Sequence, residues 1–128
     1  MPYILDTCTL LWLGGDPDRL SKKAQQLIDH PENELAVCDT SLWEIALKYR
    51  AGKLPLPIPA TQWIEKQLDF FQIQHLSIAL EDILVSAELK SDHNDPFDRL
   101  IAAQAIRHGS PVITPDQELS KLGANALW

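Results

Sequence analysis

The sequence has little of what a disulfide-bonded, zinc-binding or membrane-spanning protein requires. Only two of its 128 residues are cysteines, and Cys8 and Cys38 form no CxxC pair. We therefore expect two small buried thiols, with neither a structural zinc site nor a disulfide framework. No apolar run approaches the roughly 20 residues that cross a bilayer. The N-terminal residues show neither the basic region nor the cleavage site of a signal peptide, which predicts a cytoplasmic protein with no membrane association.

Basic residues are also scarce. The chain has 11 lysines and arginines against 18 aspartates and glutamates, a net charge of −7. This balance argues against a protein that binds nucleic acid mainly by neutralising phosphates. Carboxylates that hold a metal still count as charge until the cation binds, and a local basic cluster or a basic partner would be hidden in the average. The charge therefore disfavours a nucleic-acid function without excluding it.

The length and the pattern of apolar residues favour one globular domain over residues 1–128. Short strands are predicted at 3–5, 34–38, 73–76, 111–114 and 125–128. Helices are predicted at 7–13, 21–30, from 41 to a stop at Gly52, at 60–71, 79–89 and 95–108, and shortly after 116. This alternation predicts the α/β class, with a mostly parallel central sheet covered by helices on both faces. A site is then expected beyond the carboxyl ends of the strands.

Four carboxylates fall at positions that would meet at this edge. Asp6 ends the first strand, and Asp116 lies just past the strand that ends at 114. Glu44 and Asp98 are expected in the first turns of helices that begin there. Like charges about 4 Å apart repel by roughly 4 kcal/mol at an effective dielectric near 20, so such a cluster needs shared protons or a divalent cation. Oxygen ligands without a Cys/His set suit Mg²⁺ or Mn²⁺, and a metal so held suits phosphodiester hydrolysis.

Each of these residues also has a structural interpretation. Glu44 completes a capping box with Ser41, and Asp98 complements the dipole of its helix. Asp116 is equally compatible with a turn or an N-cap. Asp6, which closes an apolar strand, is the hardest to explain in this way. Position alone leaves both interpretations open.

The segments around the four carboxylates resemble those of PIN-domain ribonucleases of the VapC toxin type. The segments are ILDTCTLLW at 4–12, TSLWEIALK at 40–48, HNDPFDRLIAAQA at 93–105 and VITPD at 112–116. Four matches in this order span nearly the whole chain. The resemblance implies a three-layer α/β/α sandwich and an endoribonuclease that depends on Mg²⁺ or Mn²⁺. It also implies a homodimer that a small antitoxin protein holds inactive, with RNA as the substrate.

Carried over by motif, the resemblance makes Asp6, Glu44, Asp98 and Asp116 the acidic set. Asp6 and Asp98 are then the principal metal ligands, and Glu44 and Asp116 are each a ligand or a water-orienting base. Thr7 and Thr114 are placed to orient ligands or phosphate through hydroxyl hydrogen bonds. Pro115 departs from the pattern, since such proteins often have a small residue there.

Other polar residues near the motifs remain open. Asp95 precedes Pro96 and is expected to cap the helix rather than bind metal. His93 is either a phosphate contact, a proton donor to the leaving group, or a solvated loop residue. Lys48 and Arg99 either contact an RNA backbone or belong to exposed helix faces. The aromatic residues Trp12, Trp43, Trp63 and Phe97 are interpreted as core or dimer contacts rather than base-stacking platforms.

Three rival functions make different demands on the sequence. A phospho-receiver domain needs an adjacent acidic pair after the first strand, but Asp6 is followed by Thr7. A phosphatase with a nucleophilic aspartate usually has a DxD pair, and position 8 is Cys8. A catalytically silent PIN-fold module that binds RNA or protein is the remaining alternative. All four carboxylates are present, so the sequence shows no sign of lost catalysis.

Overall fold

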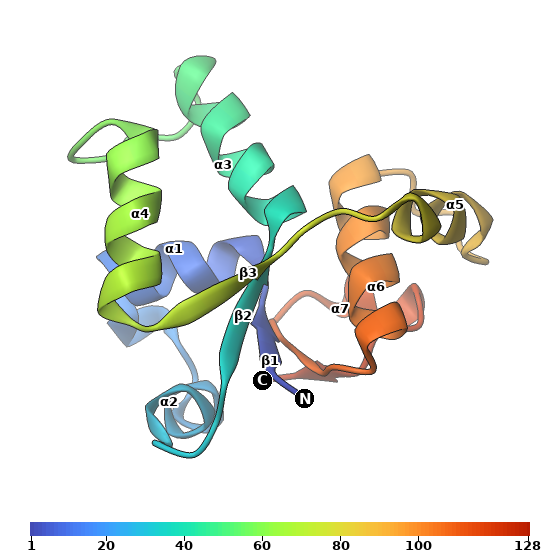
Figure 1. Cartoon of the computed structure of the whole chain (residues 1–128), viewed down its shortest axis with the longest axis horizontal. Helices are drawn as coiled ribbons and strands as arrows, with labels where there is room; N and C mark the ends of the chain where they lie inside the picture. The colour runs from blue at the N-terminus through green and yellow to red at the C-terminus, as the bar shows by residue number, and fades with distance from the viewer.

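The computed structural model describes all 128 residues and joins five strands in one sheet (Figure 1). The strands are β1 (Tyr3–Leu5), β2 (Leu35–Cys38), β3 (Ile73–Leu76), β4 (Val112–Ile113) and β5 (Ala126–Leu127). Their order across the sheet is β3-β2-β1-β4-β5, and every neighbouring pair is parallel. The predicted α/β class with a parallel sheet is confirmed.

Seven α-helices connect the strands. They are α1 (Thr7–Gly15), α2 (Lys22–Asp29), α3 (Asp39–Arg50), α4 (Ala60–Phe70), α5 (Leu80–Glu88), α6 (Pro96–His108) and α7 (Gln117–Lys121), with a 3₁₀ turn at Pro17–Arg19. The predicted caps are confirmed where they depend on local chemistry. The hydroxyl of Ser21 accepts from the N–H of Ala24 at 3.0 Å, and Asp95 accepts from the N–H of Phe97 at 2.9 Å. Gly109, with a left-handed φ of 63°, ends α6.

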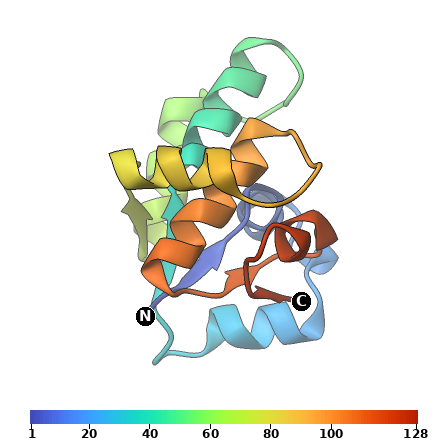
Figure 2. The same ribbon diagram turned by 90° about the vertical axis from the view of Figure 1, so that its right-hand side faces the viewer.

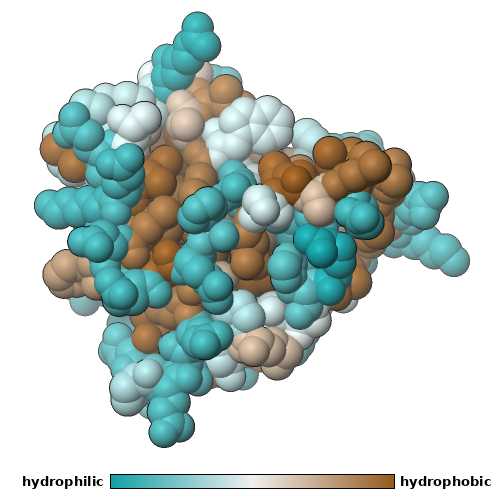
Figure 3. All heavy atoms as spheres, in the orientation of Figure 1, coloured by the Kyte–Doolittle hydropathy of each residue, from teal (hydrophilic) through white to brown (hydrophobic).

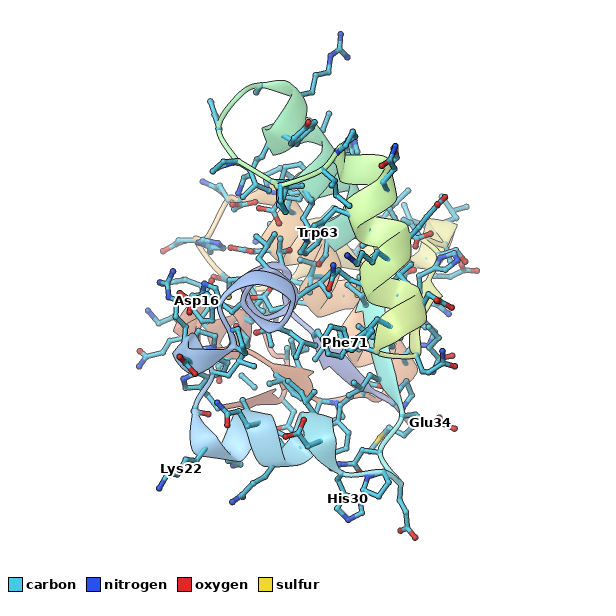
Figure 4. The ribbon with its side chains drawn as sticks, turned by 90° about the vertical axis from the view of Figure 1, so that its left-hand side faces the viewer. Asp16, Lys22, His30, Glu34, Trp63 and Phe71 are labelled. Atoms are coloured by element: carbon cyan, nitrogen blue, oxygen red, sulfur yellow. The ribbon has the colours of Figure 1, made fainter.

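Alternating strand residues supply the two faces of the sheet. Leu5, Val37 and Ile113 face a core that includes residues of α1, α2, α3 and α4. Their neighbours along the strands, such as Ile4 and Val112, face a second core with α6 and α7. Figure 2 shows the second face, where α5 packs on α6, and Figure 4 shows the first face with α1, α2 and α4. The predicted three layers are therefore present.

The order of the strands creates a crevice at the centre of the sheet. The chain moves outward from β1 to β2 and β3, then returns to place β4 on the other side of β1. Leu5 of β1 pairs with Ile113 of β4, so Asp6 and Thr114 leave neighbouring strands at the same edge. Connections that leave β1 and β4 diverge to opposite faces, which opens a site between them.

The start of α3 differs from the prediction. The helix begins at Asp39, directly after β2, so Ser41 lies inside it and Glu44 lies in its second turn. The proposed capping box is wrong, since the buried hydroxyl of Ser41 has no hydrogen-bond partner and Glu44 bonds elsewhere. Because Glu44 does not cap the helix, its carboxylate is available to the crevice.

The aromatic residues divide into core and surface. Trp63 is buried in the core, and Trp12 packs against Trp128 with ring centroids 5.7 Å apart. Trp43 is 52% exposed and contacts Phe97 edge-on at 5.0 Å, so it is not a core residue, and its alternative role as a dimer contact stays a prediction. Both cysteines are free thiols, as predicted, although Cys8 is only half-buried. No helix is both long and apolar enough to span a bilayer.

Candidate active site

A cleft of about 280 Å³ opens at the carboxyl ends of β1 and β4. Its lining includes all four predicted carboxylates; the residues are Asp6, Thr7, Cys8, Leu11, Glu44, Lys48, Asp95, Asp98 and Asp116. Five of the nine are acidic and one is basic. The fold therefore brings together side chains from opposite ends of the sequence, and it leaves their charge largely uncompensated.

Asp6 lies deepest and is only 5% exposed. Its Oδ1 accepts from the N–H of Thr7 at 2.8 Å, and its Oδ2 accepts from the hydroxyl of Thr114 at 2.7 Å. Burial raises the pKa of Asp6, and the charges of Asp116 and Glu44 add to this, while the two hydrogen bonds partly offset it. No basic side chain pairs with Asp6, so its charge is costly unless a cation approaches.

Glu44 is held by one residue on each side. Its Oε1 accepts from the hydroxyl of Thr7 at 2.7 Å, and its Oε2 pairs with Nζ of Lys48 at 2.6 Å. Lys48 lies one turn along α3, so the i,i+4 spacing was a signal that sequence reasoning did not use. The hydrogen bond to Glu44 raises the pKa of Lys48. Lys48 is thus the basic residue of the cleft and partly neutralises Glu44.

Asp98 lies in the first turn of α6, as predicted. Its Oδ2 is 2.7 Å from Nε2 of His93. Burial raises the pKa of Asp98 to about 6; the hydrogen bond from His93 lowers it, and the charges of Asp95, Asp6 and Asp116 raise it further. The same hydrogen bond raises the pKa of His93. His93 is therefore bound to a cleft carboxylate, and its interpretation as a solvated loop residue is wrong.

Asp95 and Asp116 both cap helices while lining the cleft. Oδ1 of Asp95 accepts from the first turn of α6, and Oδ1 of Asp116 accepts from the N–H of Glu118 at 2.9 Å. Thr114 accepts from the N–H of Asp116 at 3.0 Å, which fixes the turn after Pro115. In each aspartate the second oxygen has no protein partner. The structural and functional interpretations are therefore compatible for these two residues.

The donor set of the cleft fits a hard divalent cation. Its five acidic side chains offer carboxylate oxygens as metal ligands, and Mg²⁺ and Mn²⁺ prefer oxygen ligands of this kind. At one side of the cleft, His93, Asp95 and Asp98 place three possible donor atoms within 4.8 Å of one another. This trio shares only Asp98 with the predicted set, because it contains the capping Asp95 and His93 and lacks Asp6, Glu44 and Asp116.

Arg99 does not face the cleft. Its guanidinium donates to backbone carbonyl oxygens at the end of α5 and in the segment that follows, including that of His93 at 2.9 Å. Four of its five N–H donors are used in this way, which favours a structural role for Arg99 over a contact with RNA.

A larger cavity of about 330 Å³ lies between α1 and α4. It is lined mainly by apolar side chains, among them Ile58, Trp63, Phe70 and Phe71. Lys66 is the only charged residue in its lining. The cavity therefore lacks the groups for acid–base or metal chemistry, which the acidic cleft has.

The fully parallel sheet, its helical layers and the acidic cleft at its topological switch define an α/β/α sandwich protein with a carboxylate site. The model of the PIN domain family matches residues 3–125, and the chain belongs to this family. It is 33% identical over 116 residues to Ribonuclease VapC22 of Mycobacterium tuberculosis (strain ATCC 25618 / H37Rv), covering 91% of this chain and 88% of that protein.

Solved structures show the same fold at low sequence identity. A chain in the crystal structure of VapBC2 from Rickettsia felis, bound to a DNA fragment from their promoter, has a TM-score of 0.69 and 17% identity; the match covers 99% of this chain and 98% of that chain. A chain of a toxin-antitoxin complex from Klebsiella pneumoniae has a TM-score of 0.66 and 15% identity, over 98% and 96% of the two chains. These structures show the fold, and the family model and the VapC22 relative confirm the resemblance at the level of the family.

Proposed function

We propose that this chain is an endoribonuclease that hydrolyses RNA phosphodiester bonds with Mg²⁺ or Mn²⁺ held in the acidic cleft. The observation that carries the proposal is the convergence of Asp6, Glu44, Asp98 and Asp116 on one cleft that contains a single basic residue. Buried carboxylates without basic partners destabilise a fold unless a cation binds them. The name of the relative, Ribonuclease VapC22, supports RNA as the substrate class.

The contacts of each carboxylate suggest its role. Asp6 and Asp98 would hold the metal, because neither has a lysine or arginine partner and burial raises the pKa of both. Thr114 and Thr7 would orient Asp6, and Thr7 also orients Glu44. When bound, the metal lowers the pKa of a water and neutralises charge on the phosphate oxygens.

Glu44 and Asp116 would act on the attacking water in different ways. Both oxygens of Glu44 already accept hydrogen bonds, which suits a residue that orients rather than one that takes up a proton. Asp116 keeps one oxygen free and is the better candidate for a third ligand or for the proton acceptor. Asp95 would contribute by capping α6 and so holding Asp98 at the rim of the cleft.

We further propose that the chain is the toxin of a toxin–antitoxin pair and acts in the cytoplasm. The toxin-antitoxin complex among its structural neighbours supports this. The net charge of −7 favours a basic partner segment. The antitoxin would place a basic side chain among the carboxylates or cover the cleft, in the way that Lys48 already neutralises Glu44.

A homodimer is part of the same proposal. Three large apolar side chains on α5 are exposed, Leu80 by 67%, Ile83 by 50% and Leu84 by 57%. Figure 3 shows hydrophobic side chains gathered on the side of the molecule where α5 lies. Exposed apolar surface of this kind is often covered by another protein chain. A second copy packed on α5 would cover it.

The test is RNA cleavage by the purified chain without an antitoxin. Total RNA is incubated with Mn²⁺, with Mg²⁺ and with EDTA, alongside the Asp6→Asn variant and an Asp69→Asn control on the exposed surface of α4. Discrete fragments that require metal, persist in the control and vanish in Asp6→Asn support the enzyme. Metal binding without cleavage would point to a specific RNA substrate that is missing from the assay. Absence of both metal binding and cleavage would favour the catalytically silent binding module.

A further inference from the structure

Arg99 follows a cleft carboxylate in the sequence but points away from the cleft. Its guanidinium donates to four backbone carbonyl oxygens: Ser86 at 2.9 Å, Leu89 at 2.6 Å, Ser91 at 3.2 Å and His93 at 2.9 Å. No carboxylate pairs with it. The last carbonyls of a helix lack partners within the helix, and the rigid fork of a guanidinium can satisfy several of them at once. Arg99 therefore ties the end of α5 and residues 89–93 to α6.

The segment that Arg99 holds carries His93 to Asp98. The N–H of His93 donates to the hydroxyl of Ser91 at 3.1 Å, and Nε2 of His93 lies 2.7 Å from Oδ2 of Asp98. Nδ1 of the same ring is 3.6 Å from Oε2 of Glu118 on α7. The ring is thus hydrogen-bonded to Asp98 on one side and lies near a second carboxylate on the other, and the oxygen Oδ1 of Asp98 accepts no hydrogen bond.

These contacts form a series that begins and ends on adjacent residues of α6. Arg99 fixes the backbone of His93, and His93 fixes one oxygen of Asp98. A carboxylate ligand with one oxygen bound by a neighbour has fewer orientations to lose when it binds a cation with the other. Arg99 therefore influences the cleft through the segment that it holds, without facing the cleft itself.

We propose that Arg99 and His93 are positioning residues that orient the Asp98 carboxylate for a divalent cation. The inference rests on the proposed function, since it takes Asp98 as a metal ligand. A purely structural arginine would change the stability of the fold and leave the metal affinity unchanged. Loss of a positioning arginine lowers the metal affinity only while His93 is present to transmit the effect. The structural role and the positioning role can therefore be separated by experiment.

The experiment measures Mn²⁺ affinity by calorimetry on the full, metal-free chain without an antitoxin, with circular dichroism to verify the fold. We expect Arg99→Lys and His93→Ala each to weaken binding by about 10-fold, the lower end of the effect of outer contacts on metal ligands. His93→Gln should bind close to wild type, because its amide N–H can replace the Nε2 donor. The double variant Arg99→Lys/His93→Ala should bind Mn²⁺ as tightly as whichever single variant has the lower affinity. No further loss is expected, because the two residues act in series.

Arg107→Lys is the matched control, because Arg107 lies at the opposite end of α6 and binds Asp82. It should lower the melting temperature and leave Mn²⁺ affinity unchanged. Wild-type affinity in Arg99→Lys, a multiplicative loss in the double variant, or a loss in His93→Gln equal to that in His93→Ala would each overturn the positioning role. Wild-type affinity in Asp98→Asn would instead contradict the proposed metal site, so the two failures are distinguishable.

Discussion

The hydroxyl of Thr114 donates a 2.7 Å hydrogen bond to Oδ2 of Asp6, and this bond joins the ends of the neighbouring strands β4 and β1. The two residues are 108 positions apart in the sequence. Asp6 is buried without a basic partner, so this hydroxyl and the N–H of Thr7 are its main polar contacts. The orientation of Asp6 in the cleft therefore depends on a residue from the other end of the chain.

Replacing Thr114 by valine should lower the metal affinity of the cleft as well as the stability of the fold. Thr114→Val removes the donor to Asp6 and the acceptor for the N–H of Asp116. We expect Mn²⁺ affinity to fall by about 10-fold and the free energy of unfolding by about 1 kcal/mol. The control is Thr9→Val, since Thr9 is also buried but its hydroxyl donates to the carbonyl of Ile113. Calorimetry should show wild-type Mn²⁺ affinity in the control, and equal losses in both variants would contradict the prediction.

The charge of Asp6 should destabilise the metal-free protein. Burial raises the pKa of this carboxyl in the folded state, so the fold loses stability as the pH rises through that pKa and Asp6 ionises. Asp6→Asn cannot ionise and should therefore be more stable than wild type at pH 8 in EDTA, by about 1 kcal/mol. The difference should shrink as the pH falls through the raised pKa of Asp6, because the wild-type carboxyl then becomes protonated. Thermal melts over this range test it, and a variant that melts lower than wild type at pH 8 would argue against a buried, unpaired charge.

Two adjacent glycines at the end of α1 should respond oppositely to alanine. A Cβ on Gly14 would lie 2.6 Å from Oε1 of Gln67 and 2.8 Å from the ring of Trp63, whereas a Cβ on Gly15 would meet nothing within 4 Å. Figure 4 shows Trp63 on the side of α4 that faces α1. Gly14→Ala should cost about 1–3 kcal/mol through overpacking. Gly15→Ala should be neutral or stabilise by up to about 1 kcal/mol. Denaturant unfolding measures the free energy of unfolding of both variants. Equal changes in the two variants would contradict the close approach of α1 and α4.

The ion pair between the buried Asp82 and the exposed Arg107 should make part of the stability pH-dependent. Burial alone would raise the pKa of Asp82, but the hydrogen bonds from Arg107 and from the N–H of Ala79 hold it below its usual range. A lowered pKa stabilises the fold above the unfolded-state value near 3.8, and this contribution disappears as the pH falls through the folded-state value. Asp82→Asn should therefore cost roughly 2 kcal/mol at pH 7 and less at pH 3. Asp69→Asn on the surface is the control, and a cost independent of pH would show that the pair does not titrate as described.

The apolar surface of α5 should control self-association. We expect the purified chain to be a dimer by light scattering, and Ile83→Glu/Leu84→Glu to be a folded monomer, because a charge in an apolar contact has no partner. Glu81→Gln, on the same helix, should remain a dimer. A wild-type monomer at micromolar concentration would contradict the homodimer, and an unchanged dimer in the double variant would place the interface elsewhere.

Local features of this protein were predictable from its sequence. The apolar run Tyr3–Leu5, the cap of Ser21, the Asp95–Pro96 start of α6 and its end at Gly109 all appear in the structure as expected. Each depends on chemistry within about four residues, so the neighbours in the chain are sufficient to specify it. The convergence of Asp6 and Asp116 was also predictable, because parallel strands direct their carboxyl ends to one edge of the sheet.

The partners of the cleft residues were decided only by the tertiary structure. Ser41 and Glu44 suited a capping box by their spacing, but β2 runs directly into α3 and Glu44 instead bonds to Thr7. Asp98 of α6 has as its partner His93 from the preceding loop, and Arg99 binds the backbone of that loop. A carboxylate accepts from any donor that the fold brings near it, so the sequence determined where the acidic residues lie. The packing of distant segments determined which donor each one has and how much of its charge is left for a cation.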